Sequence, residues 1–190
     1  MLYGLIMIDL RLPQTKDPYY CVMGNTPTDM IFVCVWVGDK YPESYVNRLY
    51  HDVNKHTDNE FKFYCLTDNK LSNDNIIPIP VFNNRQGWWQ KTSLFAKDLF
   101  PHGAIVVYMD LDVVITNKID WLWGVYSDKS LCMIKNFGPN RGHSNHNSSV
   151  MTWMSGNPKL HCIDENMSDE VIKKLPSDRD WETELYNKWV

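Results

Sequence analysis

The sequence predicts an α/β fold in which helices alternate with strands around a mostly parallel central sheet. Three short, strongly apolar runs rich in β-branched residues carry this prediction, because such runs are typical of strands buried on both faces. They are MIFVCVWVG (30–38), FKFYCLTD (61–68) and AIVVYMDLDVVI (104–115). Between the first two, Tyr45, Leu49 and Val53 recur at helical spacing, so a helix is expected in YPESYVNRLYHDVNKHT (41–57).

The remaining segments continue the alternation. We expect, in order, a proline-limited extended segment, a helix, a short helix or turn, a strand, a polar loop, an extended segment and a charged, partly helical end. These are residues 76–82, 87–100, 117–125, 130–137, 138–147, 148–156 and 157–190. Residues 30–190 form one predicted domain, and residues 1–29, interrupted by prolines, form an N-terminal extension that we expect to be an appendage.

Composition limits the classes of protein to which the chain can belong. Hydrophobic residues make up 44% and aromatic residues 13%, which predicts a packed core, and the formal charge of −4 argues against a nucleic-acid-binding protein. No apolar run approaches the length of a membrane span, about 18 residues. Cys34, Cys65 and Cys132 lie within apolar runs and no CxxC pair occurs, so we expect buried, reduced thiols and a cytoplasmic protein.

Two carboxylates follow the most strand-like run of the sequence. Asp110 and Asp112 are two residues apart, so on a regular strand their side chains would point the same way. Ligands of parallel α/β sheets bind beyond the carboxyl ends of the strands, and paired oxygen donors suit Mg²⁺ or Mn²⁺, which also bind substrate phosphates. The alternative is a pair of acids that cap a strand at the surface.

The surrounding sequence resembles GT-A-fold glycosyltransferases, enzymes that use nucleotide-sugar donors. YMDLDVVITNKIDWLW (108–123) resembles their DxD region, whose acids bind a divalent cation that holds the donor diphosphate. Four more segments resemble, in order, the first strand with its nucleotide-contacting loop, the second strand, the helix before the DxD, and the sugar pocket. They are residues 36–53, 61–68, 87–95 and 147–156. SDRDWETEL (177–185) resembles a late segment usually written with Asp-Gln-Asp, so the resemblance covers roughly Met30 to Leu185.

The resemblance implies a three-layer GT-A sandwich and a set of donor-binding residues. Backbone groups of Val35 and Val37 and the ring of Tyr41 would hold the base and ribose, unless Tyr41 is only a surface ring. Asp68 would meet the nucleotide or cap its strand. Lys91 would neutralise diphosphate charge, the alternative being a solvated lysine.

The motif and the later segments complete the implied site. Asp110 and Asp112 would hold Mn²⁺ or Mg²⁺, with Asp110 and Leu111 also at the nucleotide sugar. Asn147 and Ser148 would bind donor hydroxyls. His143 and His146 have the spacing of a metal pair, but zinc would need further ligands, so a polar loop is the preferred interpretation.

Three residues of the late segment are candidates for catalysis. Asp178 or Asp180 would orient or deprotonate the acceptor, and Arg179 would stabilise the departing diphosphate; the alternative is a solvated helix start. Arg179 stands where many family members have glutamine, and the chain ends at Val190, before a histidine that completes the metal shell in glycogenin and the bacterial galactosyltransferases.

The predicted function is the transfer of a sugar, with retention, from a nucleotide-sugar donor, by resemblance a UDP-sugar, to a carbohydrate or other hydroxyl acceptor. One alternative is a sugar-nucleotide or glycan-binding protein without turnover. Another is a phosphohydrolase of the haloacid dehalogenase type, whose nucleophile motif is also an apolar strand followed by DxD. That fold has its motif on the first strand, whereas here a long part of the domain precedes it.

Overall fold

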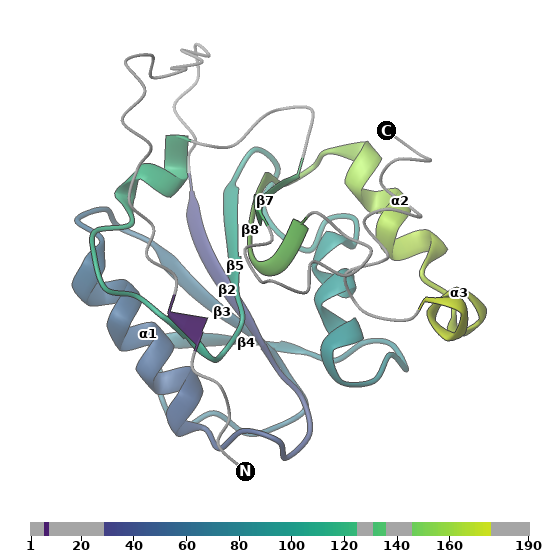
Figure 1. Ribbon diagram of the computed structural model, residues 1–190, viewed down its shortest axis with the longest axis horizontal. Coiled ribbons are helices and arrows are strands. Elements are labelled where there is room, and N and C mark those ends of the chain that lie inside the picture. The colour runs from purple at the N-terminus through teal and green to yellow at the C-terminus, as the bar shows by residue number, and fades with distance from the viewer. Residues whose placement is uncertain (1–5, 8–28, 125–130, 136–145, 176–190) are drawn as a thin grey trace.

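The computed structural model describes residues 6–7, 29–124, 131–135 and 146–175, and within them the predicted α/β class is confirmed. Six strands form one sheet in the order β4-β3-β2-β5-β8-β7 (Figure 1). Their bounds are β2 Met30–Trp36, β3 Lys62–Thr67, β4 Ile76–Pro80, β5 Ile105–Met109, β7 Cys132–Lys135 and β8 His146–Met154. The strands β4, β3, β2 and β5 are parallel, whereas β8 runs antiparallel to β5 and to β7. The sheet is therefore mixed.

The central strands are apolar throughout because both faces of the sheet are covered. In β2, Phe32 and Cys34 pack toward one core, while Ile31 and Val33 pack toward another. Helix α1 (Ser44–His56) supplies the first core with a row of buried side chains at helical spacing, Val46, Leu49 and Val53. The second core receives the 3₁₀ segment η1 (Gly87–Phe95) and helix α2 (Pro158–Asn166), which lie on the other side of the sheet (Figure 1).

The α-helix expected in residues 87–100 is instead the 3₁₀ helix η1, which ends at Phe95. Every residue from Gln90 to Phe95 is buried, so the segment has no polar face of the kind that defines an amphipathic α-helix. Trp88, near the start of the segment, has 56% of its surface exposed. Because 3₁₀ geometry makes poorer backbone hydrogen bonds, a segment of this length depends on side-chain contacts to stay in place.

Smaller elements complete the described chain: β1 (Ile6–Met7), β6 (Val113–Val114), η2 (Asp120–Gly124) and α3 (Asp169–Lys174). β1 pairs in parallel with β6, so the backbone of the N-terminal extension touches the chain directly after Asp112. None of the helices among the described residues has the length and apolar character needed to cross a membrane.

The cysteines follow the prediction except at the edge of the sheet. Cys34 and Cys65 are buried neighbours in the register of β2 and β3, and both are free thiols. Burial, and then the Cys65 thiol beside it, raises the pKa of Cys34, which keeps that thiol protonated. Cys132, expected to be buried, is only half-buried, and it lies on β7, the edge strand of the described sheet.

Candidate functional site

The order of the parallel strands reverses between β2 and β5, and open α/β sheets form their ligand-binding crevice beyond the carboxyl ends of the strands at such a point. From β2 the chain moves outward through β3 and β4 and then returns to β5, on the other side of β2. The chain after β2 and the chain after β5 both pack on the face of the sheet that α1 covers, so the two loops lie beside each other at the carboxyl ends of these parallel neighbours. The loop after β2 contains Val37 and Tyr41, and the loop after β5 contains Asp110 and Asp112.

The antiparallel strand β8 brings a third segment to the same edge. Because β8 runs against β5, its first residues lie beside the last residues of β5: Val150 pairs with Met109. The backbone amide of Asp110 donates to the carbonyl of Ser149 at 2.9 Å. The predicted sugar-pocket residues Asn147 and Ser148 therefore lie next to the motif, although they are far from it in sequence.

The Asp110–Leu111–Asp112 segment is a tight turn and not part of a strand. β5 ends at Met109, and the amide of Val113 donates to the carbonyl of Asp110 at 3.2 Å to close the turn. Leu111, the middle residue of the turn, has 4% of its surface exposed and packs into the core, which anchors the turn to the domain. The segment is therefore not the regular strand on which both carboxylates would point the same way, and each carboxylate has its own neighbours.

Asp110 belongs to a buried polar cluster. Its Oδ1 accepts hydrogen bonds from Lys91 Nζ, at 3.2 Å, and from the Tyr108 hydroxyl. Lys91 Nζ also donates to Ser148 Oγ at 3.3 Å and lies 5.4 Å from the centre of the Tyr108 ring. Only 2% of the Lys91 surface is exposed, so the alternative of a solvated lysine is wrong. An ammonium group is buried at such a place only when carboxylate and hydroxyl partners offset the loss of hydration.

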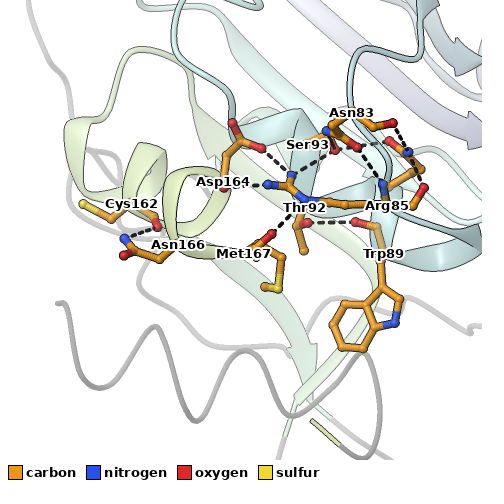
Figure 2. A network of polar contacts seen from close by, with 10 residues as sticks. Asn83, Arg85, Trp89, Thr92, Ser93, Cys162, Asp164, Asn166 and Met167 are labelled. Atoms are coloured by element: carbon orange, nitrogen blue, oxygen red, sulfur yellow. Dashed lines mark hydrogen bonds and ion pairs between the residues drawn. The ribbon is translucent and has the colours of Figure 1, made fainter. Parts of the chain in front are cut away.

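Arg85 anchors the η1 segment that carries Lys91. Its guanidinium donates to Ser93 Oγ at 3.0 Å, to the Asp164 carboxylate and its backbone carbonyl, the latter at 2.6 Å, and to the Met167 carbonyl at 3.2 Å (Figure 2). Asn83 Nδ2 also donates to Ser93 Oγ, at 2.6 Å. These contacts fasten η1 to the carboxyl end of α2. No pattern in the sequence indicates them, because Asp164 lies 79 residues from Arg85.

The loop after β2 is held in shape by side chains from the end of β2 and from the loop after β3. Trp36 Nε1 donates to the Tyr41 carbonyl at 2.8 Å. The Gly38 peptide is held on both sides, since its amide donates to Asp68 Oδ1 and its carbonyl accepts from Asn69 Nδ2, each at 3.0 Å. Gly38 has φ +73°, which favours glycine at this position. Asp68 therefore helps to fix the predicted nucleotide loop, and a contact between Asp68 and the nucleotide stays a prediction.

Tyr41 connects this loop to the motif. Its hydroxyl donates to Asp112 Oδ2 at 3.3 Å. Burial is the main cause that raises the pKa of Tyr41; Lys40 lowers it in part, and the Asp112 carboxylate raises it again. The phenol therefore keeps its proton and remains a donor. Val35 and Val37, the other residues predicted to face the base, are half-buried at the end of β2.

The two polar residues at the start of β8 have different partners. Ser148 contributes its hydroxyl to Lys91, as described above, whereas Asn147 Oδ1 accepts from the Ser149 amide at 2.8 Å. Only 6% of the Asn147 surface and 3% of the Ser148 surface are exposed. His146 is exposed at the first position of β8 and pairs in register with Lys135. His143 lies outside the described residues.

Asp178, Arg179 and Asp180 also lie outside the described residues. Within the described part of the chain, no group of three or more His, Cys, Asp or Glu side chains is placed to hold a metal ion. Asp110 and Asp112 carry carboxylate oxygens of the kind that Mg²⁺ binds, and Mg²⁺ usually takes its other ligands from phosphate oxygens and water. Mn²⁺ prefers the same oxygen ligands.

Comparison with known proteins adds no identity to this geometry: neither a model of a known family nor a curated protein sequence matches the chain.

Proposed function

We propose that the chain is a metal-dependent glycosyltransferase of the GT-A type, which transfers a sugar from a nucleotide-sugar donor, by resemblance a UDP-sugar, to a hydroxyl acceptor. One observation supports this most: Lys91 is buried between Asp110 and Ser148 at the carboxyl end of β5, where the strand order reverses between β2 and β5. A cation and a paired carboxylate at a topological switch point suit a ligand that carries phosphate.

Each residue of the site has a role in this proposal. A divalent cation on Asp110 and Asp112 would supply Lewis acidity as negative charge develops on the leaving diphosphate. Lys91 adds positive charge beside the same oxygens, and the low exposure of its surroundings strengthens that interaction. Ser148 and Asn147 are close enough to the motif to meet donor hydroxyls.

The loop after β2 is the proposed base and ribose contact. Val35, Val37 and Tyr41 line it, and Asp68 holds its backbone through Gly38. Asp178, Arg179 and Asp180 are proposed for the acceptor side of the reaction, by resemblance to the family. The proposed stereochemistry is retention, in which the acceptor attacks from the face that the diphosphate leaves.

The experiment that tests the proposal measures nucleotide released from a panel of nucleotide sugars by purified protein with Mn²⁺. We expect release from one donor, its loss with EDTA, and a decrease of at least about 100-fold in Asp112→Asn, since the variant lacks one charge at the cation site. The matched control is Asp58→Asn, because Asp58 is an exposed carboxylate whose ion-pair partner is Lys118, away from the site.

Release that is insensitive to both EDTA and Asp112→Asn would contradict the proposal. Where no release occurs, calorimetry with the same donors and UDP separates the remaining cases. Metal-dependent binding without turnover, also in the presence of carbohydrate acceptors, would favour the non-catalytic sugar-nucleotide binding protein. Absence of binding would mean that the crevice is not a donor site.

A further inference from the structure

A row of side chains in contact, from Tyr41 through Tyr45 to Arg48, runs from the loop after β2 along the first turns of α1. Lys40 Nζ lies 4.8 Å from the centre of the Tyr41 ring, the rings of Tyr41 and Tyr45 are 4.9 Å apart, and the Arg48 guanidinium lies 4.7 Å from the Tyr45 ring. Contacts of this kind are favourable between a guanidinium and an aromatic ring. Tyr45 and Arg48 meet because residues three apart lie on the same side of a helix.

Both ends of this row touch the same turn. At one end, the Tyr41 hydroxyl donates to Asp112 Oδ2 at 3.3 Å. At the other end, Arg48 Nη2 donates to the backbone carbonyl of Leu111 at 2.7 Å. The turn that holds the two carboxylates is therefore fixed at its side chain by the loop after β2 and at its backbone by α1.

Part of the Arg48 guanidinium is buried at an energetic cost. Its Nε is buried and has no hydrogen-bond partner among the described residues, and an unpaired buried donor is unfavourable. The guanidinium keeps this position because it stacks on Tyr45 and holds the Leu111 carbonyl. A short or neutral side chain at position 48 would leave the carbonyl in the middle of the turn without that donor.

We propose that Arg48 is a positioning residue: through the Leu111 carbonyl and the stack with Tyr45 and Tyr41, it sets the orientation in which Asp112 binds the divalent cation. This inference rests on the proposed function, since it assumes a cation at the turn. It assigns no contact between Arg48 and the donor. Its consequence is that changes on α1, which contribute no ligand, weaken the affinity of the turn for the cation.

Mn²⁺ binding to the full chain tests this, measured in the presence of UDP by the electron paramagnetic resonance signal of free Mn²⁺. We expect Arg48→Met and Arg48→Lys to bind Mn²⁺ about 10- to 100-fold more weakly than the wild type, the usual effect of removing a partner that orients a metal ligand. Arg48→Lys keeps the charge but lacks the planar fork. Tyr45→Phe keeps the ring, so it should bind Mn²⁺ like the wild type.

Two controls separate positioning from general damage. Lys55→Met removes an exposed cation from the same helix, and Leu160→Ala destabilises the core on the opposite face of the sheet. Both should retain wild-type Mn²⁺ affinity while folded, as checked by circular dichroism. If Arg48→Met fails to fold, Arg48→Lys carries the test.

The outcomes distinguish the inference from the proposed function. Folded Arg48→Lys that binds Mn²⁺ as tightly as the wild type would overturn the positioning role and leave the metal site intact. An equal loss of affinity in Leu160→Ala would also overturn it, because the effect would then follow stability. A wild-type protein that binds no Mn²⁺ with UDP would overturn the proposed function itself.

Discussion

Replacing Arg85 with methionine should remove about 3 kcal/mol of stability, because the change leaves a largely buried carboxylate without its partner. Side-chain exposure is 10% for Arg85 and 19% for Asp164, and loss of one partner of a buried ion pair typically costs about 3–5 kcal/mol. The low end applies, since water reaches the partly exposed Asp164. The carbonyls of Asp164 and Met167 and the Ser93 hydroxyl lose their donor as well. Methionine keeps most of the apolar stem, so packing changes little.

Urea unfolding followed by tryptophan fluorescence and circular dichroism measures this loss. For a chain of this length a loss of about 3 kcal/mol corresponds to a decrease of about 6–12 °C in Tm. Asp164→Asn should cost less, about 1–2 kcal/mol, because the amide oxygen still accepts from the guanidinium. A double-mutant cycle between the two positions should give a coupling energy above about 1 kcal/mol.

The control is Lys97→Met, an exposed lysine in the segment that follows η1; it should change stability by less than about 0.5 kcal/mol. The reasoning is refuted if Arg85→Met is equally neutral, or if the losses at Arg85 and Asp164 simply add. Either result would mean that η1 is held by its buried apolar residues alone.

Two further predictions concern other parts of the fold. Gly156 and Gly103 have nearly the same φ, +83° and +82°, but a Cβ on Gly156 would lie 2.2 Å from His102 Cδ2 while one on Gly103 meets nothing within 4 Å. Gly103→Ala should therefore lower the free energy of unfolding by about 1 kcal/mol, for the backbone alone. Gly156→Ala should lower it by about 1 kcal/mol more, because the exposed His102 ring must also move. Urea unfolding of both variants measures the two losses, and equal losses would contradict this prediction. Partial burial raises the pKa of Asp120. Hydrogen bonds from the Thr57 hydroxyl, the Asp58 amide and the Asn59 side chain lower it by more, so the net pKa lies below the ordinary value. The contribution of Asp120 to stability is therefore present above about pH 4 and is lost as pH falls through the lowered pKa. The difference in the free energy of unfolding between wild type and Asp120→Asn, about 1 kcal/mol at neutral pH, should vanish in acid. A difference that does not change with pH would contradict this prediction.

The strands that the sequence indicates most clearly are those buried on both faces. β2, β3 and β5 read as continuous apolar runs because α1 covers one side of the sheet while η1 and α2 cover the other. The direction of a strand, in contrast, is not indicated by its apolar pattern. An antiparallel strand is as apolar as a parallel one when both faces are covered, so residues 148–156 predicted an extended segment but not the antiparallel direction of β8.

The site could be predicted to the extent that it follows from strand ends. The turn at Asp112 and the loop at Tyr41 meet because they follow the carboxyl ends of β5 and β2, which are parallel neighbours in the sheet. The burial of Lys91 was not visible, because its partners Asp110 and Ser148 are 19 and 57 residues away. Arg48 was missed for the same reason: in the sequence it is an ordinary helix residue, and only its contact with Leu111 gives it a role.

The charges around the turn give a reason for a cation requirement that does not depend on resemblance. Asp110 and Asp112 carry two negative charges, and Lys91, the cation in direct contact with Asp110, carries one positive charge. Arg48, whose guanidinium binds the Leu111 carbonyl at 2.7 Å, adds a second positive charge, so the charges of these four residues only balance. A negatively charged diphosphate gains no net attraction from them. A divalent cation on the two carboxylates makes the balance positive and supplies that attraction. Removal of the cation should therefore lower the affinity of the site for a diphosphate. The loss of affinity should be smaller in Asp112→Asn than in the wild type, because the variant holds the cation less well.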